Sequence, residues 1–493
     1  MVLLSKKNSP AGHDQLPERV IQVGEGRFLR AFVDWMINEL NERRIFNGSI
    51  VVVAPRPSGG ANLARLGAQD NLYTVWQRGY TRGGIVDRKE LVSSISRCID
   101  PYKNWSDFIR CAENPEINIF VSNTTEAGLV YKEEPYAPDK PLQTFPAKLT
   151  AYLYHRFKHF DGERAYGMVV VPCELVDDNG DRLKGLVLQY AHDWQLPAAF
   201  ISWLEEANHF CNTLVDRIVS GVPEQDILKN IFDEMGYEDY FLTVCEPFHL
   251  WAVQDGGRLR AMLPLDRIGL NVHYVDDVAP YRLQKVRILN GTHTLMTPLS
   301  LLYGRNTVFE AVNNEFISRL IRRMMFKEII PVLDFAESDL KQYADSVLER
   351  FSNPFIRHNL NDIMLNALSK FTVRVLPTIK EYVGRFKTLP PLITLCSAAF
   401  LLYYRQKPDA CLRADSHPDL NKLLGIWSEE EKYGLEETVS RILGLETIWG
   451  EDLNALPGLC RSLSGHIRGM RSRSVEEYVN QMVEEVETGE MVE

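Results

Sequence analysis

The stretch VIQVGEGRFLRAF, residues 20–32, decides the fold of the first half of this chain. It reads as a buried strand, then two glycines one residue apart, Gly24 and Gly26, then the start of a helix. In that setting a GxG turn can bring backbone N–H groups up to a pyrophosphate, and the helix dipole favours the negative charge. The third small residue of the full fingerprint would fall on Leu29. The turn alone therefore leaves dinucleotide binding and a plain strand-to-helix connection equally open.

A second check is the end of the next strand, where dinucleotide-binding proteins often carry an acid for the ribose 2′-hydroxyl. Here that strand ends in VAPRPS, residues 53–58, which contains no acid. Arg56 either accepts a 2′-phosphate or stacks on adenine. NAD and NADP thus remain alternatives at this point.

Continuous apolar runs alternate with amphipathic helices over the first half of the chain. This pattern is typical of a parallel sheet covered on both faces, so we expect an α/β fold there. From about residue 276 onward the pattern is helical. The expected strands are residues 20–23, 49–54, 117–123 and 167–175, and the expected divisions are an arm (1–18), a dinucleotide-binding domain (19–280) and a helical substrate and catalytic domain (281–493).

The bulk properties limit the class of partner. The formal net charge of −11 argues against nucleic acid or an anionic membrane as the main partner. The eight cysteines are scattered without CxxC pairs or a zinc-ligand spacing, so we expect a reduced, cytoplasmic protein and no metal site. The apolar run at the N-terminus is too short for a signal peptide, and no run reaches the roughly 18 residues of a membrane span.

The segment KVRILNGTH, residues 285–293, carries three polar side chains that point to chemistry. On a regular helix at 100° per residue, Lys285, Asn290 and His293 share one face about 140° wide. In a functional interpretation Lys285 is the general base, with burial and Arg287 favouring its neutral form. Asn290 donates to the oxygen that gains negative charge, and His293 orients that oxygen or a hydroxyl. The alternative is a surface lysine, a helix interruption and a core histidine.

With this trio in view, the chain resembles the long-chain polyol-specific dehydrogenases, the mannitol dehydrogenase family. Their K-x4-N-x2-H motif is matched by Lys285, Asn290 and His293. The resemblance runs from about residue 18 to beyond residue 450. The other segments that carry it are GEGRFLRAF (24–32), FPAKLT (145–150), TLVDRIV (213–219), CEPFHLW (245–251) and RFSNPFI (350–356).

The resemblance implies a Rossmann-type first domain, a helical second domain, metal-independent chemistry and a substrate held between the two domains. It also implies NAD as cofactor, and it places Asn123 and Glu126 of SNTTEAG at the cofactor, where Glu126 exchanges protons with Lys285. A capped turn is the alternative for SNTTEAG. The expected cofactor contacts are Val23, Gly24, Glu25, Gly26, Arg27, Phe28, Arg56, Asn123, Thr125 and Glu126.

Within the family, residues 21–35, 120–128, 172–181 and 327–334 resemble the branch that acts on keto-uronates. The expected reaction is the reversible reduction of D-tagaturonate to D-altronate by NADH in hexuronate breakdown. Fructuronate or mannitol-type activity is the runner-up, and a silent nucleotide- or sugar-binding regulator is the hypothesis from another class. The sequence leaves the oligomeric state open.

A keto-uronate carries a carboxylate, which a guanidinium binds best. We expect Arg350 and His358 to line the site, although Arg357, Lys370 and Arg374 are also candidates. Polyol-active members tend to carry an asparagine where this chain has Leu175. Asn179 is therefore expected to contribute to the oxyanion site in its place.

Overall fold

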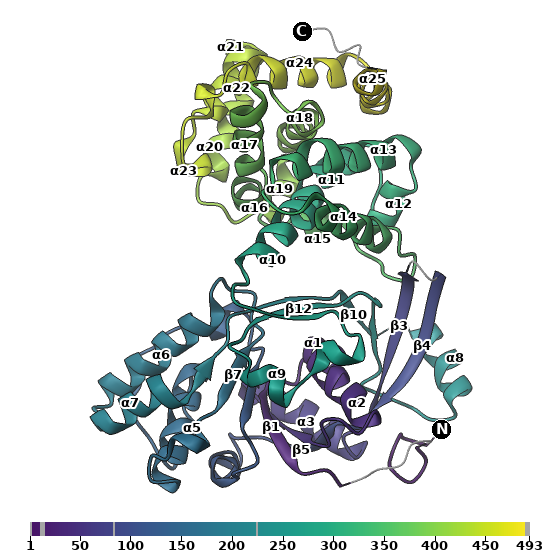
Figure 1. The fold of residues 1–493 in the computed structure, drawn as a ribbon. Coiled ribbons are helices and arrows are strands. Elements are labelled where there is room, and N and C mark those ends of the chain that lie inside the picture. Colours follow the sequence, from purple (N-terminus) through teal and green to yellow (C-terminus); the bar gives the residue numbers. More distant parts are fainter. Residues whose placement is uncertain (1, 10–14, 82–83, 223–224, 489–493) are drawn as a thin grey trace. The chain divides into compact units, whose positions relative to one another are not determined.

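The computed structural model describes residues 2–9, 15–81, 84–222 and 225–488. The chain forms two compact units. Unit 1 comprises Met1–Gly79 and Gly84–Tyr281, and unit 2 comprises Tyr80–Gly83 and Arg282–Glu493. Figure 1 shows strands in the purple-to-teal part of the chain and helices throughout the green-to-yellow part.

A six-stranded sheet in the order β5-β2-β1-β6-β7-β8 forms the centre of unit 1, and every neighbouring pair is parallel. The chain builds outward from β1 to β2 and β5, then returns to the other side of β1 with β6. Ligands of such sheets bind at the carboxyl ends of the strands where the order reverses. This places the expected cofactor site at the ends of β1, β2 and β6. The strands are β1 Glu18–Val23, β2 Ser49–Val53, β5 Ile95–Ile99, β6 Ile119–Ser122, β7 Val169–Pro172 and β8 His209–Phe210.

Both faces of this sheet are buried, because neighbouring residues of each strand point into different apolar clusters. Val20 and Ile50 pack with Phe32 and Leu63 on one face, whereas Ile21 packs on the other. The prediction of a parallel sheet covered on both sides is confirmed. The covering helices are α1 Arg27–Leu29, α2 Trp35–Glu42 and α3 Gly60–Ala68 on one face, and α4 Trp105–Arg110, α5 Phe145–His159, α6 Asn179–Asp193 and α7 Ala198–Ala207 on the other.

Two smaller sheets complete unit 1, in the orders β10-β11-β3-β4 and β13-β12-β9. The sequence does not predict these strands, because they are short or mix exposed and buried positions. Their bounds are β3 Tyr73–Thr81, β4 Gly84–Val92, β9 Thr213–Asp216, β10 Val219–Gly221, β11 Thr243–Cys245, β12 Leu250–Gln254 and β13 Val272–Val275, with helices α8 Gln225–Met235, α9 Arg258–Met262 and α10 Ala279–Gln284 nearby in the chain.

Unit 2 is helical, as the sequence predicts. Its core helix α18, Pro391–Gln406, is buried from Leu392 to Tyr404 and packs against α11 and α24. The Glu328 carboxylate accepts the N–H groups of Leu392 and Ile393 at 2.8 Å, which satisfies two buried donors that have no partner within α18. Among the described residues, no helix combines the length and apolarity that crossing a bilayer requires. Other long helices are α11 Gly291–Leu302, α13 Glu315–Met324, α14 Glu337–Phe351, α16 Ala367–Arg374, α17 Leu376–Phe386, α22 Leu435–Leu443, α24 Leu459–Ser472 and α25 Val475–Thr488.

Candidate active site

The glycine turn connects the ends of three central strands. Gly24 has a φ of +134°, which L side chains rarely adopt. A Cβ at this position would lie 2.9 Å from the carbonyl oxygen of Asn123. The Gly24 N–H also donates to the carbonyl of Val53 at 3.0 Å. Only glycine fits here, and its backbone fixes the turn between β1, β2 and β6.

Gly26 differs from Gly24 because the fold does not require it. Its φ is −66°, and a Cβ there would meet no heavy atom within 4 Å. The residue is exposed at the start of the helical run from Arg27 to Glu42. Open space beside an exposed backbone at a helix N-terminus suits the close approach of a phosphate. The turn therefore fits a dinucleotide.

The side chains around the turn differ in how far a ligand can reach them. Val23 is fully buried, so it offers only its backbone. Arg27 is exposed and lies against Gly221, and Phe28 stacks on Phe32 with ring centroids 4.8 Å apart. These positions leave Arg27 as the accessible cation of the turn.

The side chain of Arg30 stabilises the glycine turn through hydrogen bonds. Its guanidinium donates to the carbonyl of Glu25 at 2.7 Å and to the hydroxyl of Thr243 at 3.2 Å. Nearby, complete burial raises the pKa of the Asp34 carboxyl to about 7, against the opposing effect of Arg30. Sequence reasoning missed this support because Arg30 looks like a surface residue of an amphipathic helix.

The SNTTEAG loop at the end of β6 is held by Glu174. Its carboxylate accepts the Ser122 hydroxyl at 3.0 Å and the Thr124 N–H at 2.9 Å, and burial raises its pKa. Asn123 donates to the carbonyl of Cys173 at 2.7 Å. Thr125 has a φ of +71°, which is unusual for a β-branched residue and typical of strained functional loops. The side chain of Glu126 lies outside the described part of the structure.

Arg56 is exposed directly after β2, where the sequence showed no acid. The structure brings two carboxylates to this point. The Glu25 Oε1 lies 2.7 Å from where a Cβ on Gly59 would be, and the Asp100 carboxylate fills the corresponding space at Gly60. Sequence reasoning missed Asp100 because it follows β5, a strand that was not expected.

The Lys285–Asn290 segment of unit 2 is not the regular helix that the sequence analysis assumed. It is a π-helix, and the Gly291 N–H bonds to the carbonyl of Val286, five residues back. The angles drawn at 100° per residue are therefore wrong. In a π-helix, residues five positions apart are separated by about one turn. Lys285 and Asn290 therefore lie closer together on one face than they would in a regular α-helix. Both are half-buried.

Arg287 of the π-helix is held by partners on α17. Its guanidinium is buried and donates to the Thr378 hydroxyl and the Glu381 carboxylate, both at 2.7 Å. Because the charge is paired with α17, Arg287 anchors the π-helix to that neighbour. The backbone of Arg374, at the end of α16, also lies close to the π-helix. Its carbonyl oxygen is 3.3 Å from where a Cβ on Gly291 would be.

His293 is buried in α11 and packs against Phe351 of α14 and His358. Its ring stacks on Phe351 with centroids 4.4 Å apart, and it meets His358 edge to face at 5.0 Å. Burial lowers the pKa of His358, Asp362 opposes that shift, and the charge of buried Arg350 adds to it. The structure thus brings His293, Arg350 and His358 together, whereas Lys370 donates to the carbonyl of Ile363.

Asn179 has a structural role in place of the substrate contact that the sequence suggested. It is completely buried at the start of α6. Its amide nitrogen donates to the carbonyls of Pro172 and Glu174, and its oxygen accepts the Thr213 N–H at 2.8 Å. Because both ends of the amide are used by the fold, Asn179 fixes the loop after β7. Leu175 in that loop is 59% exposed.

One trio of metal-ligand types occurs in the described residues, although the sequence analysis found no such spacing. His209, Cys211 and Asp255 have donor atoms within 4.8 Å of one another. Both Asp255 oxygens already accept backbone N–H groups of α9, from Leu259 and Arg260 at 2.9 Å. The Asp255 carboxylate is therefore explained by its hydrogen bonds to the N-terminus of α9, without a metal ion.

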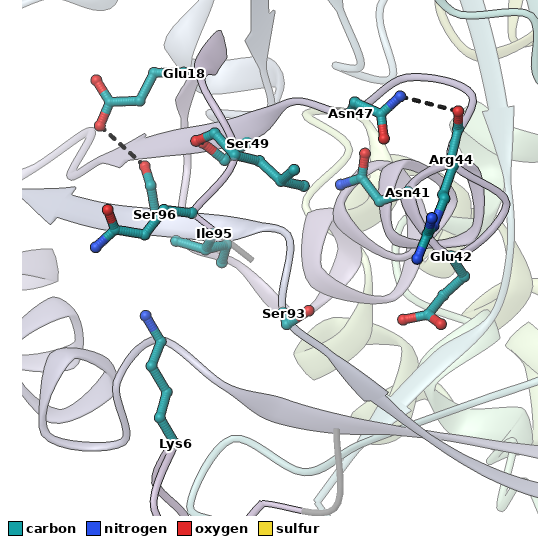
Figure 2. Close-up of a pocket in the computed structure, with 12 residues that line it drawn as sticks. Lys6, Glu18, Asn41, Glu42, Arg44, Asn47, Ser49, Ser93, Ile95 and Ser96 are labelled. Carbon is teal, nitrogen blue, oxygen red and sulfur yellow. Dashed lines mark hydrogen bonds between the residues drawn. The ribbon is translucent and has the colours of Figure 1, made fainter. Parts of the chain in front are cut away.

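A polar pocket of about 690 Å³ lies at the opposite edge of the sheet (Figure 2). Glu18 begins β1, Ser49 begins β2 and Ile95 begins β5, so the pocket lies at the amino ends of these strands. Asn41 and Arg44 line it from the end of α2. Rossmann-type sheets bind their ligands at the carboxyl ends, so this pocket is separate from the glycine turn.

Comparison with known proteins agrees with this geometry. Residues 18–267 match the mannitol dehydrogenase Rossmann domain, and residues 277–470 match the mannitol dehydrogenase C-terminal domain. The chain belongs to the mannitol dehydrogenase family. It is therefore an oxidoreductase, and the Rossmann domain of such a dehydrogenase binds a nicotinamide cofactor.

Relatives in the mannitol dehydrogenase family cover nearly the whole chain. A Halalkalibacterium halodurans protein named altronate oxidoreductase is 43% identical over 89% of this chain and 88% of its own length. A Bacillus subtilis protein of the same name is 42% identical over 96% and 97%. The solved Pseudomonas fluorescens mannitol 2-dehydrogenase, a complex with NAD and D-mannitol, has a TM-score of 0.72 and 23% identity, covering 98% of this chain and all of its own. That likeness concerns the fold.

Proposed function

We propose that this chain catalyses the reversible, NAD-dependent reduction of D-tagaturonate to D-altronate. The observation that carries the proposal is the placement of a buried arginine, Arg350, beside the His293–His358 pair in the unit that holds the Lys285–Asn290 turn. A guanidinium there suits the substrate carboxylate, which neutral polyols lack. The names of the relatives that are 42–43% identical support the same substrate.

Lys285 is the general acid and base in this proposal. When bound, the nicotinamide cofactor supplies the hydride to the keto carbon of the substrate. The Lys285 ammonium gives a proton to the keto oxygen during reduction and regains it from the hydroxyl during oxidation. Asn290 donates a hydrogen bond to the same oxygen, and the π-turn keeps the two side chains on one face.

Arg350 and His358 hold the remainder of the substrate. Arg350 donates to the carboxylate, preferably with two parallel N–H bonds. His358 stays neutral near pH 7, because burial and Arg350 lower its pKa, and it donates or accepts one hydrogen bond. His293 orients a neighbouring hydroxyl, with its ring fixed by Phe351.

The cofactor is NAD in this proposal and binds along the carboxyl edge of the central sheet. Gly24, Glu25 and Gly26 accommodate the pyrophosphate, with Arg27 as the nearby cation, while Val23 and Phe28 support the turn. Arg56 contacts the adenosine. The SNTTEAG loop, with Asn123, Thr125 and Glu126, borders the nicotinamide.

Deuterium transfer tests the reaction directly. The purified protein is mixed with NADH deuterated at the transferred position and with D-tagaturonate, D-fructuronate or D-fructose, each in a separate reaction. We expect D-altronate with one deuterium on the former keto carbon, identified by NMR and mass spectrometry. Deuterated D-mannonate or D-mannitol as the main product would move the chain to a different branch of the family. Absence of transfer to any substrate, with NADH bound, would support a silent regulator.

A further inference from the structure

We propose that Asp100, together with Glu25, replaces the acid that is missing after β2 and makes the adenosine end of the cofactor site select NAD over NADP. The inference rests on the proposed function, because it concerns the cofactor of that reaction. The selecting acid would then follow the neighbouring strand β5. A search for an acid at the end of β2, its usual position, does not find it.

The strand pairing places Asp100 beside the end of β2. Strands β2 and β5 are parallel neighbours, with Val53 opposite Ile99. The Ala54 N–H continues the ladder by donating to the carbonyl of Ile99 at 3.0 Å. Asp100 directly follows β5, so it leaves the sheet at the carboxyl end of the strands, level with Ala54. This is the edge at which Rossmann-type domains bind the adenosine ribose.

The Asp100 carboxylate lies at the first residue of α3. A Cβ on Gly60 would overlap its Oδ2, so glycine at that position leaves room for the carboxylate. The Tyr102 N–H donates to Asp100 Oδ1 at 3.1 Å and fixes the rotamer. The side chain is 15% exposed and therefore reachable. Its ion pair with Lys103, at 3.5 Å, involves a largely exposed lysine and constrains it little.

Glu25 brings a second carboxylate to the adjoining position. It comes from the glycine turn, and its Oε1 lies 2.7 Å from where a Cβ on Gly59 would be. Two carboxylates from separate segments thus occupy the space that side chains of residues 59 and 60 would take. The turn that faces the pyrophosphate and the segment that faces the ribose are linked by this contact.

The charges at this point favour a ribose diol over a 2′-phosphate. Ionised carboxylates accept hydrogen bonds from the hydroxyls of NAD, whereas the phosphate of NADP would meet charges of its own sign. Two exposed cations belong to this region, Lys103, which pairs with Asp100 at 3.5 Å, and Arg56. Burial raises the pKa of Tyr102, and the nearby charge of Arg56 opposes that shift. We infer that Arg56 stacks on adenine.

Binding of cofactor fragments tests this inference without turnover. Calorimetric titrations compare ADP-ribose with its 2′-phosphorylated form, and fluorescence titrations compare NADH with NADPH. Wild-type protein should prefer the forms without the 2′-phosphate. Asp100→Asn and Glu25→Gln should each reduce that preference about tenfold, mainly by strengthening binding of the phosphorylated ligand. Glu116→Gln is the matched control, since Glu116 is an exposed acid paired with Arg19 at the amino edge of the sheet.

Results that differ from these expectations would overturn either the inference about Asp100 and Glu25 or the proposed function. An unchanged preference in both Asp100→Asn and Glu25→Gln would overturn the inference, as would wild-type protein that binds both forms equally. Wild-type protein that binds neither would instead contradict the proposed function. If Arg56→Ala selectively loses the phosphorylated ligand, Arg56 reads the phosphate and the inference is wrong. Melting curves check that variants are folded, and either acidic variant alone suffices if the other is unstable.

Discussion

The imidazole of His293 meets that of His358 edge to face, with ring centroids 5.0 Å apart and ring planes at 84°. His293 belongs to α11, which follows the Lys285–Asn290 turn. His358 lies in the segment after α14, the helix that contains Arg350. The residues proposed for proton transfer and those proposed for carboxylate binding are therefore parts of one packed cluster within unit 2. Substitutions in one group can be compared with substitutions in the other.

Replacement of Arg350 by alanine should weaken binding of the charged substrate. Loss of hydrogen bonds to a charged group costs about 1.5–3 kcal/mol, so KM for D-tagaturonate should rise about 10- to 100-fold. Steady-state kinetics on D-tagaturonate and on an uncharged ketose measure the effect. Arg322→Ala, which removes a largely exposed arginine of α13, is the control. An equal loss on both substrates would exclude a carboxylate-binding role.

Replacement of Lys285 by alanine should lower kcat about 10³-fold, because the proton on the keto oxygen then has no positioned donor. The NADH dissociation constant, measured by fluorescence, should not change, since Lys285 lies outside the Rossmann-type unit. Lys380→Ala removes an exposed lysine paired with Glu451 and serves as the control. Full turnover in Lys285→Ala would remove this residue from the acid–base role.

Alanine at the two glycines of the turn should give opposite results. Gly24→Ala forces a strained φ and a contact with Asn123, and should cost about 2 kcal/mol or more of unfolding free energy. Gly26→Ala meets no atom of the protein and should keep wild-type stability while binding NADH about tenfold more weakly, because the methyl group occupies the open space beside the turn. Denaturant melts and NADH titrations measure both. Unaltered NADH binding by Gly26→Ala would contradict the pyrophosphate assignment.

Lys148 should make stability depend on pH. Burial lowers the pKa of its ammonium group to about 8, although Glu134 opposes the shift, so the unfolded chain binds more protons than the folded one above that pH. Stability from this group therefore rises between about pH 8 and the unfolded pKa of about 10.4. Relative to Lys148→Met, wild-type protein should gain about 1–2 kcal/mol between about pH 7.5 and 9.5. Urea melts at both pH values measure this difference, and a constant difference would contradict the assigned shift.

The sequence was sufficient for the elements with strong local signals. The strand–turn–helix at Gly24 and Gly26 and the continuous apolar strands predict the parallel sheet, and apolar α18 predicts the helical core. The π-turn at Lys285–Asn290 was not predictable, because regular and widened helical turns share the same residue preferences. Its position depends on tertiary contacts such as those of Arg287 with α17.

Residues that act through neighbours distant in sequence were also missed. Asp100 follows a strand with alternating exposure, so its proximity to the end of β2 depends on sheet order. Asn179 was expected at the substrate from its chemistry alone, yet its amide forms hydrogen bonds with the nearby Pro172 and with the distant Thr213. In both cases the contact partners, and not the residue types, decide the role.

NADH consumption by the purified protein tests whether the substrate is a keto-uronate. D-Tagaturonate and D-fructose are offered at matched concentrations, and kcat/KM is measured for each. We expect the kcat/KM for D-tagaturonate to be at least about 100-fold higher, because a hydrogen bond to a charged group is worth about 1.5–3 kcal/mol and the enzyme also selects the configuration of the substrate. An equal or higher value for D-fructose would contradict it.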